Sequence, residues 1–294
     1  MPTEIASRQL WSECLEELIA VHPWPPTVRF LVADWLPQTL LQDWSVKHAR
    51  YVTTVTPKLD MPGLPLELLA HLPGTGPGFE FRRLFVQLCT AASTGQVAQI
   101  PRLAHSALRI AEAQGWFALG SAVHLLLGGG LAASGQTREV LEAYRSARQM
   151  ARKVTDPSGP KMAVTAALAE GGALLEAGDY RAARNVYLEA AREADEGAQT
   201  MSSMDAHRMA SYCAEADGDL ENAWEDAQAA VRIARDLPSD ARRDSTLPAL
   251  LTRMEEMARK PEMMVRNVSV ERECRELLGS EWTGVLDRTR SLLS

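Results

Sequence analysis

The chain has 294 residues, of which 46% are hydrophobic and 23% charged, and a formal net charge of −7. This composition is typical of a globular protein with a sizeable core and excludes wholesale disorder, while the net acidity disfavours a chain-wide nucleic-acid surface. The four cysteines are too dispersed for a disulfide scaffold or a zinc ribbon and are typical of a reducing compartment: Cys14, Cys89, Cys213 and Cys274.

Residues 1–72 are expected to be helical without a clear repeat. Four acidic residues interrupt the first 25 positions, so no signal peptide is expected. Tryptophan is favoured at interface anchors, which would make this segment a docking patch, but solenoids need atypical ends, so an N-terminal cap is the preferred interpretation. Four of the seven tryptophans lie here: Trp11, Trp24, Trp35 and Trp44. Residues 73–78, PGTGPG, are expected to form a loop or hinge.

Four glycines recur at intervals of 40, 43 and 40 residues: Gly95, Gly135, Gly178 and Gly218. A helical segment rich in Ala and Leu precedes each glycine, and a second segment with an alanine twelve positions further on follows it. Glycine accepts the positive φ that ends a helix, and Asp179 and Asp219 are expected N-caps of the next one. Each unit is therefore a predicted helical hairpin that buries its apolar face only by stacking on its neighbours.

The third unit resembles a tetratricopeptide (TPR) repeat at Gly171, Gly178, Tyr180, Ala183, Tyr187 and Ala190. The second unit matches at Gly128, Gly135, Tyr144 and Ala147, and the fourth at Gly218, Ala223 and Ala230, with Ala227 in the usual aromatic position. In the first unit Gly95 and Ala107 fit, but Pro101 interrupts the second helix unless that helix starts late, with the proline in its first turn. The period near 40 also exceeds the 34 of the family.

The resemblance covers about residues 80–236 and implies an all-α fold, a solenoid of stacked hairpins with helical caps at residues 1–72 and 245–294. It also implies that five positions of each first helix line a concave groove for a polypeptide partner. In this chain they include Arg82, Phe85, Leu125, Leu168, Glu176, Asp205, Arg208, Tyr212 and Glu215. The Lys and Asn of the family's carboxylate clamp are missing, so no such clamp is expected.

Charge is unevenly distributed along the repeats. Residues 82–153 hold nine basic and three acidic side chains, whereas residues 161–240 hold seven basic and sixteen acidic ones. Two interpretations stay open at this point: solvated helix faces, or a polar surface whose acidic part meets a basic ligand segment.

The segment from residue 113 to 137 has no charge, but its interior glycines and His124 favour a buried helix over a membrane span. After residue 245 two helices are expected, at residues 247–260 and 269–293. The methionines there are expected to fill core gaps, with an adaptable binding surface as the alternative: Met254, Met257, Met263 and Met264.

No P-loop, HExxH or GxSxG motif occurs, and Cys213 has no adjacent base. His124 and His207 occupy the same position in two repeats. We expect both to pack against the neighbouring helix rather than to bind a shared ligand. The sequence therefore favours a non-enzymatic protein-interaction adaptor with no cofactor or metal. A cytoplasmic location is expected, and the excess of Arg over Lys is typical of a bacterial protein. The alternative is a ligand- or peptide-responsive regulator, although residues 1–72 show no helix-turn-helix. Neither nucleic acid nor membrane insertion is expected, and homo-oligomerisation stays open.

Overall fold

The computed structural model describes residues 13–18, 41–55 and 74–293. The chain divides into two compact units, residues 1–60 and 61–294. The first unit contains a helical turn at residues 13–18 and the helix α2 (Gln42–Lys47). Glu16 accepts hydrogen bonds from Lys47 Nζ at 2.6 Å and from His48 Nε2 at 2.9 Å, and these bonds lower the pKa of its carboxyl group. Trp11, Trp24 and Trp35 lie outside the described residues, so the cap and docking interpretations of this segment both remain predictions.

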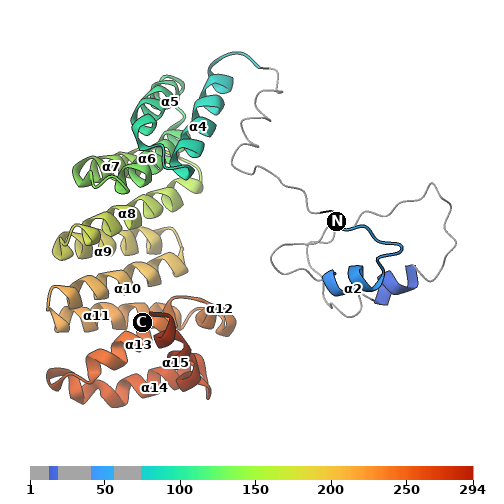
Figure 1. Ribbon diagram of the computed structural model, residues 1–294. Helices are drawn as coiled ribbons and strands as arrows, with labels where there is room; N and C mark the ends of the chain where they lie inside the picture. The colour runs from blue at the N-terminus through green and yellow to red at the C-terminus, as the bar shows by residue number, and fades with distance from the viewer. Residues whose placement is uncertain (1–12, 19–40, 56–73, 294) are drawn as a thin grey trace. The chain divides into compact units, whose positions relative to one another are not determined.

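The second unit is a stack of antiparallel helix pairs, and its described residues contain no strand (Figure 1). This confirms the predicted all-α solenoid. The first four pairs are α4 (Pro77–Ser93) with α5 (Ile100–Gln114), α6 (Phe117–Ala132) with α7 (Thr137–Ala151), α8 (Ser158–Glu176) with α9 (Tyr180–Glu196), and α10 (Thr200–Ala216) with α11 (Leu220–Ala234).

The four periodic glycines occupy the turns between the paired helices, as predicted. Gly95, Gly135, Gly178 and Gly218 have φ angles of 70°, 71°, 77° and 83°, in the left-handed region that side chains with a Cβ rarely adopt. Asp179 and Asp219 then cap the following helices, because their side chains accept the backbone N–H groups of Ala182 and Asn222, each at 3.1 Å.

Pro101 lies in the first turn of α5, which is one of the two arrangements that the sequence left open. A short 3₁₀ turn, η1 (Val97–Gln99), precedes the helix, which begins at Ile100. Proline costs no hydrogen bond there, because the first N–H groups of a helix have no partner within it. The first hairpin is therefore complete.

Close contact between paired helices depends on matched side-chain sizes. The alanines twelve positions after each turn glycine, Ala107, Ala147, Ala190 and Ala230, are all 0% exposed. In the second and third hairpins, the residue seven positions before the turn glycine is a glycine, and it packs against a tyrosine nine positions after the turn glycine. The pairs are Gly128 with Tyr144 and Gly171 with Tyr187. The first hairpin has Leu88 and Ala104 at these positions, and the fourth has Ser211 and Ala227, all buried. Ala227 thus replaces the family's aromatic residue without leaving a cavity, because the residue opposite it is Ser211 rather than a glycine.

A fifth hairpin follows, which the glycine spacing did not reveal. It consists of α13 (Leu247–Ala258), the 3₁₀ segment η2 (Pro261–Arg266) and α14 (Asn267–Leu278), and it is preceded by the short α12 (Ser239–Asp244). The expected single helix over residues 269–293 is wrong: Gly279, with φ of 83°, separates α14 from α15 (Trp282–Leu293).

The large C-terminal core cluster contains three of the four methionines singled out above. Met254, Met257 and Met263 are at most 1% exposed, which confirms the core interpretation for them, while Met264 is 59% exposed. The uncharged segment at residues 113–137 is divided by Gly115, where α5 ends and α6 follows. Within the described ranges, no helix combines the length and the apolar character that crossing a bilayer needs.

Candidate binding face

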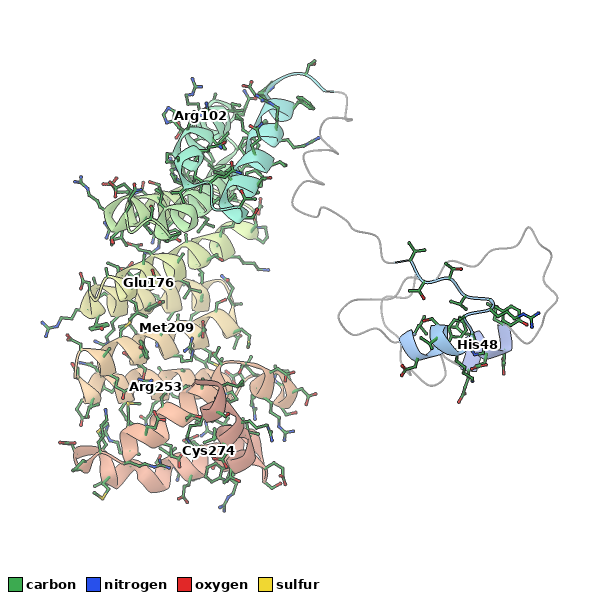
Figure 2. The ribbon with its side chains drawn as sticks, in the orientation of Figure 1. His48, Arg102, Glu176, Met209, Arg253 and Cys274 are labelled. Carbon is green, nitrogen blue, oxygen red and sulfur yellow. The ribbon has the colours of Figure 1, made fainter. Side chains whose placement is uncertain are left out.

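The first helices of successive hairpins contact one another along one surface. Three contacts join α10 to α13 and its N-cap residue Thr246. Thr246 Oγ1 donates to Asp205 Oδ1 at 2.9 Å, Arg253 lies 4.8 Å from the ring centroid of Tyr212, and Arg253 pairs with Glu215. We call the surface that α6, α8, α10 and α13 form together the first-helix face. Figure 2 labels Glu176, Met209 and Arg253, which follow one another along the stack on α8, α10 and α13.

Polar and aromatic side chains gather at the α10–α13 end of the first-helix face. Glu215 Oε2 accepts two bonds from Arg253, at 2.8 Å from Nη2 and 3.1 Å from Nε, and Glu215 Oε1 accepts one from Lys260 at 3.1 Å. Tyr212, 36% exposed, lies under the Arg253 guanidinium in a cation–π geometry. Arg208 pairs with Asp205 at 2.8 Å on the neighbouring turn.

The two acids expected to attract a basic ligand are therefore already paired within the chain. Asp205 is bonded by Arg208 and Thr246, and Glu215 by Arg253 and Lys260. A basic ligand side chain would have to compete with these cations for either carboxylate. Sequence reasoning missed Thr246, Arg253 and Lys260 because the fifth hairpin has no turn glycine to reveal its register.

The apolar residues predicted for the upstream lining contribute partly to the core. Phe85 is half-buried and stacks on Phe81 with ring centroids 5.8 Å apart, so it belongs largely to the first hairpin's packing. Leu125 and Leu168 are half-buried against the cores of the second and third hairpins. Arg82 and Glu176 are exposed. The structure thus spreads the nine predicted residues over α4, α6, α8 and α10, and brings together Asp205, Arg208, Tyr212 and Glu215 on α10.

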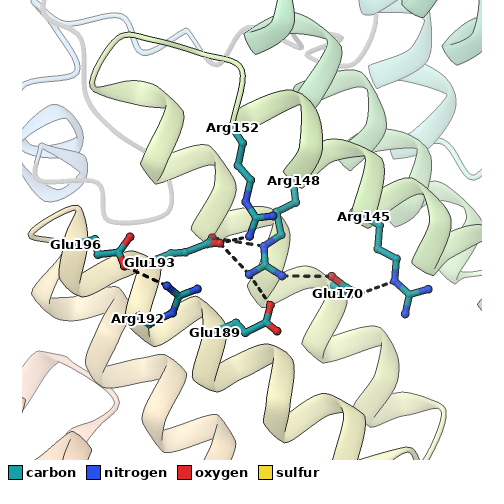
Figure 3. A network of polar contacts seen from close by, with 8 residues as sticks. All are labelled: Arg145, Arg148, Arg152, Glu170, Glu189, Arg192, Glu193 and Glu196. Atoms are coloured by element: carbon teal, nitrogen blue, oxygen red, sulfur yellow. Dashed lines mark hydrogen bonds and ion pairs between the residues drawn. The ribbon is translucent and has the colours of Figure 1, made fainter.

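A second polar network joins the hairpins α6–α7 and α8–α9 through residues of α7, α8 and α9 (Figure 3). Arg148, 7% exposed, pairs with Glu189 and Glu193 at 2.9 Å each, and Arg145 donates to the buried Glu170 at 2.7 Å. Arg152 also pairs with Glu193. Further along the stack, Arg184 of α9 pairs with Asp226 of α11 at 2.7 Å.

These pairs account for much of the uneven charge seen in the sequence. The arginines of the basic block, Arg145, Arg148 and Arg152, face acids of the block that follows it. Opposite charges in adjacent blocks therefore bind neighbouring hairpins to each other, which favours a structural interpretation of those acids over a ligand-binding one.

His124 and His207 lie at matching packing positions, half-buried within their helices. The Nδ1 atom of each is sealed from solvent with no hydrogen-bond partner among the described residues. Burial lowers the pKa of both imidazoles, which favours the neutral form in the folded protein. Within the described ranges, no group of three or more His, Cys, Asp or Glu is placed to hold a metal ion.

The buried thiols are held in their protonated form. Burial raises the pKa of Cys213 to about 11 and that of Cys274 to about 12. A thiol with such a pKa is a poor nucleophile at neutral pH, since the thiolate is the reactive species.

The fold and the first-helix face define an all-α helical-repeat protein. Among solved structures, the apo form of RapI is similar, with a TM-score of 0.56 and 14% sequence identity; the match covers 72% of this chain and 57% of the RapI chain. At this identity the similarity shows the fold alone. No family model matches the sequence, and no curated protein matches it.

Proposed function

We propose that this protein is a non-enzymatic adaptor that binds a peptide or an extended segment of a partner protein along its first-helix face. The observation that carries the proposal is the pair of the exposed Tyr212 and the half-buried Arg253, which lies beside Glu215 and Lys260 at the junction of two hairpins. Aromatic and arginine side chains dominate the energetics of protein interfaces. The similarity to RapI supports the helical-repeat fold on which this proposal rests.

The second candidate is a regulator whose hairpins respond to a peptide or small ligand. It is favoured by the stack itself, because each hairpin contacts mainly its neighbours and its spacing can change with occupancy. Both candidates place the protein in the cytoplasm, as the dispersed free cysteines led us to expect. Neither involves nucleic acid or a cofactor.

Selection from a phage-displayed library of random peptides tests the proposal. We expect wild-type protein to enrich a related set of sequences. A variant with Tyr212→Ala and Arg253→Ala should bind the selected peptides at least about tenfold more weakly, because both changes remove interface anchors. Arg192→Ala is the matched control, since Arg192 forms an exposed pair with Glu196 on α9 at 3.2 Å.

The outcomes separate the two candidates. Failure of the wild type to enrich any peptide family would overturn the adaptor proposal. A small molecule that remains bound through purification, detected by native mass spectrometry, would instead support the ligand-responsive regulator.

A further inference from the structure

The hydroxyl groups of Tyr144 and Tyr187, which lie on second helices, end next to the first helices of their hairpins. Tyr144 on α7 and Tyr187 on α9 are 9% and 3% exposed, so their rings are core residues. Each ring packs against a glycine of the preceding helix: a Cβ at Gly128 would lie 2.5 Å from the Tyr144 ring, and one at Gly171 would lie 2.7 Å from the Tyr187 ring. The glycines let the rings cross between the paired helices.

The hydroxyls end beside the next residue of each first helix. A Cβ at Gly129 would be 3.9 Å from the Tyr144 hydroxyl, and one at Gly172 would be 3.8 Å from the Tyr187 hydroxyl. Gly129 and Gly172 hold the position that Tyr212 holds on α10, counted from the turn glycine, and that position belongs to the first-helix face. With no side chain at either glycine, a ligand can approach the helix backbone closely.

Charges of the first-helix face also act on these groups. Burial raises the pKa of Tyr187 most, Cys213, Asp205 and Glu176 raise it further, and Arg208 partly opposes them. Burial together with Glu176 raises the pKa of Tyr144. The phenols therefore stay protonated and able to donate a hydrogen bond. The Tyr187 side chain shares its core cluster with Leu174 of α8 and with Ala210 and Cys213 of α10, so it packs between two first helices.

Neither hydroxyl has a hydrogen-bond partner among the described residues, and neither is among the atoms sealed from solvent. A tyrosine hydroxyl ordinarily makes a hydrogen bond, and for these two hydroxyls the acceptor is solvent or a bound ligand. Two such hydroxyls occur at the same position of two successive hairpins, where the acceptor groups of a ligand can replace water.

We propose that Tyr144 and Tyr187 donate hydrogen bonds to two main-chain carbonyl groups of an extended peptide that crosses α6 and α8 over Gly129 and Gly172. This inference rests on the proposed function and specifies how the ligand is held. Packed helices lie about 8–10 Å apart and an extended chain rises about 3.3 Å per residue, so the two carbonyls are about three residues apart. The exposed carboxylate of Glu176, one helical turn after Gly172 on α8, is available to accept a peptide N–H.

Neighbouring hairpins do not repeat this arrangement. The first hairpin has Leu88 and Cys89 where the glycine pair would be, with Ala104 across from them, and the fourth has Ser211 and Tyr212 with Ala227. The peptide backbone is therefore held at the second and third hairpins, and its continuation meets Tyr212 and Arg253 on the fourth and fifth.

Tyr144→Phe and Tyr187→Phe test the inference, because phenylalanine keeps the ring packing and removes only the hydroxyl. With a peptide enriched by the wild type as the probe, we expect each variant to bind about three- to tenfold more weakly and the double variant about the product of both. Thermal unfolding should be unchanged. Tyr180→Phe, half-buried at the start of α9, is the control and should bind as the wild type does.

A chemical change in the peptide provides the second measurement. Replacing one peptide amide by an ester weakens the adjoining carbonyl as an acceptor, and at the contacted positions this should lower affinity for the wild type but not for the double Phe variant. If the wild type binds a selected peptide and both Phe variants bind it equally well, the inference is overturned while the proposed function stands. If the wild type selects no peptide, the proposed function fails first.

Discussion

The Arg148 guanidinium on α7 donates a hydrogen bond of 2.9 Å to Glu193 on α9. The two residues are 45 positions apart in the chain and belong to neighbouring hairpins. The same guanidinium reaches Glu189 at 2.9 Å and lies 3.9 Å from Glu170. A single arginine therefore neutralises acids on both helices of the next hairpin.

Removing this arginine should weaken the stack. We expect Arg148→Ala to lower the free energy of unfolding by about 2 kcal/mol, less than for a fully isolated buried pair, because Glu193 keeps Arg152 and Glu170 keeps Arg145. Urea unfolding monitored by circular dichroism measures the change. Arg138→Ala, which breaks an exposed pair with Glu142, should stay within about 0.5 kcal/mol of the wild type. Equal effects of the two variants would contradict the structural role of Arg148.

The same network predicts acid sensitivity. Burial raises the pKa of Glu193, but hydrogen bonds and charge from Arg152 and Arg148 outweigh it, so the net shift is downward from 4.5. A carboxyl whose folded-state pKa is depressed contributes stability above the unfolded-state pKa and loses it as pH falls through the folded-state value. Stability should therefore drop below about pH 4.5, and Glu193→Gln should make that drop shallower. An unchanged slope in unfolding free energy between pH 5 and pH 3, approximate limits set by this linkage, would refute the assignment.

The two half-buried histidines, His124 and His207, predict a separate loss of stability at milder acidity. Burial lowers the pKa of His124 and His207 from 6.5, so their stabilising contribution is complete above about pH 6.5 and is lost as pH falls through the folded-state pKa values. A double variant with His124→Gln and His207→Gln should unfold with less pH dependence in that window. The exposed His105, changed to Gln, serves as the control and should leave the wild-type pH profile intact.

Adjacent glycines of α6 should respond oppositely to alanine. A Cβ at Gly128 would lie 2.5–2.9 Å from atoms of the Tyr144 ring, so Gly128→Ala should destabilise by about 1–3 kcal/mol through overpacking. Gly129→Ala meets only the Tyr144 hydroxyl at 3.9 Å and should be neutral or stabilise by up to about 1 kcal/mol, since alanine favours helix. Denaturant midpoints of the two variants compare them directly, and a destabilised Gly129→Ala would contradict the open space above that residue.

Much of the fold was predictable from the sequence, because turn glycines indicate where a helix ends and the buried alanines indicate where two helices pack closely. Gly178 and Pro101 each identify a helix end from the conformations available to one residue. The turn of the fifth hairpin has no such glycine, and Gly279, which ends α14, lies outside the spacing of the four repeat glycines. Four of the expected binding residues lie on α10, and their binding role stays a prediction. Arg253 and Lys260, which pair with Glu215, lie about forty positions further along the chain, and the sequence alone does not indicate such a long-range pair.

The serial arrangement of the hairpins gives the molecule a mechanical property. Since every hairpin is held chiefly by the two beside it, small changes in tilt add up from one end of the array to the other, as in a spring. A polypeptide bound to α6, α8 and α10 would restrict the relative tilt of these hairpins, and would thereby stiffen the array and fix its superhelical pitch.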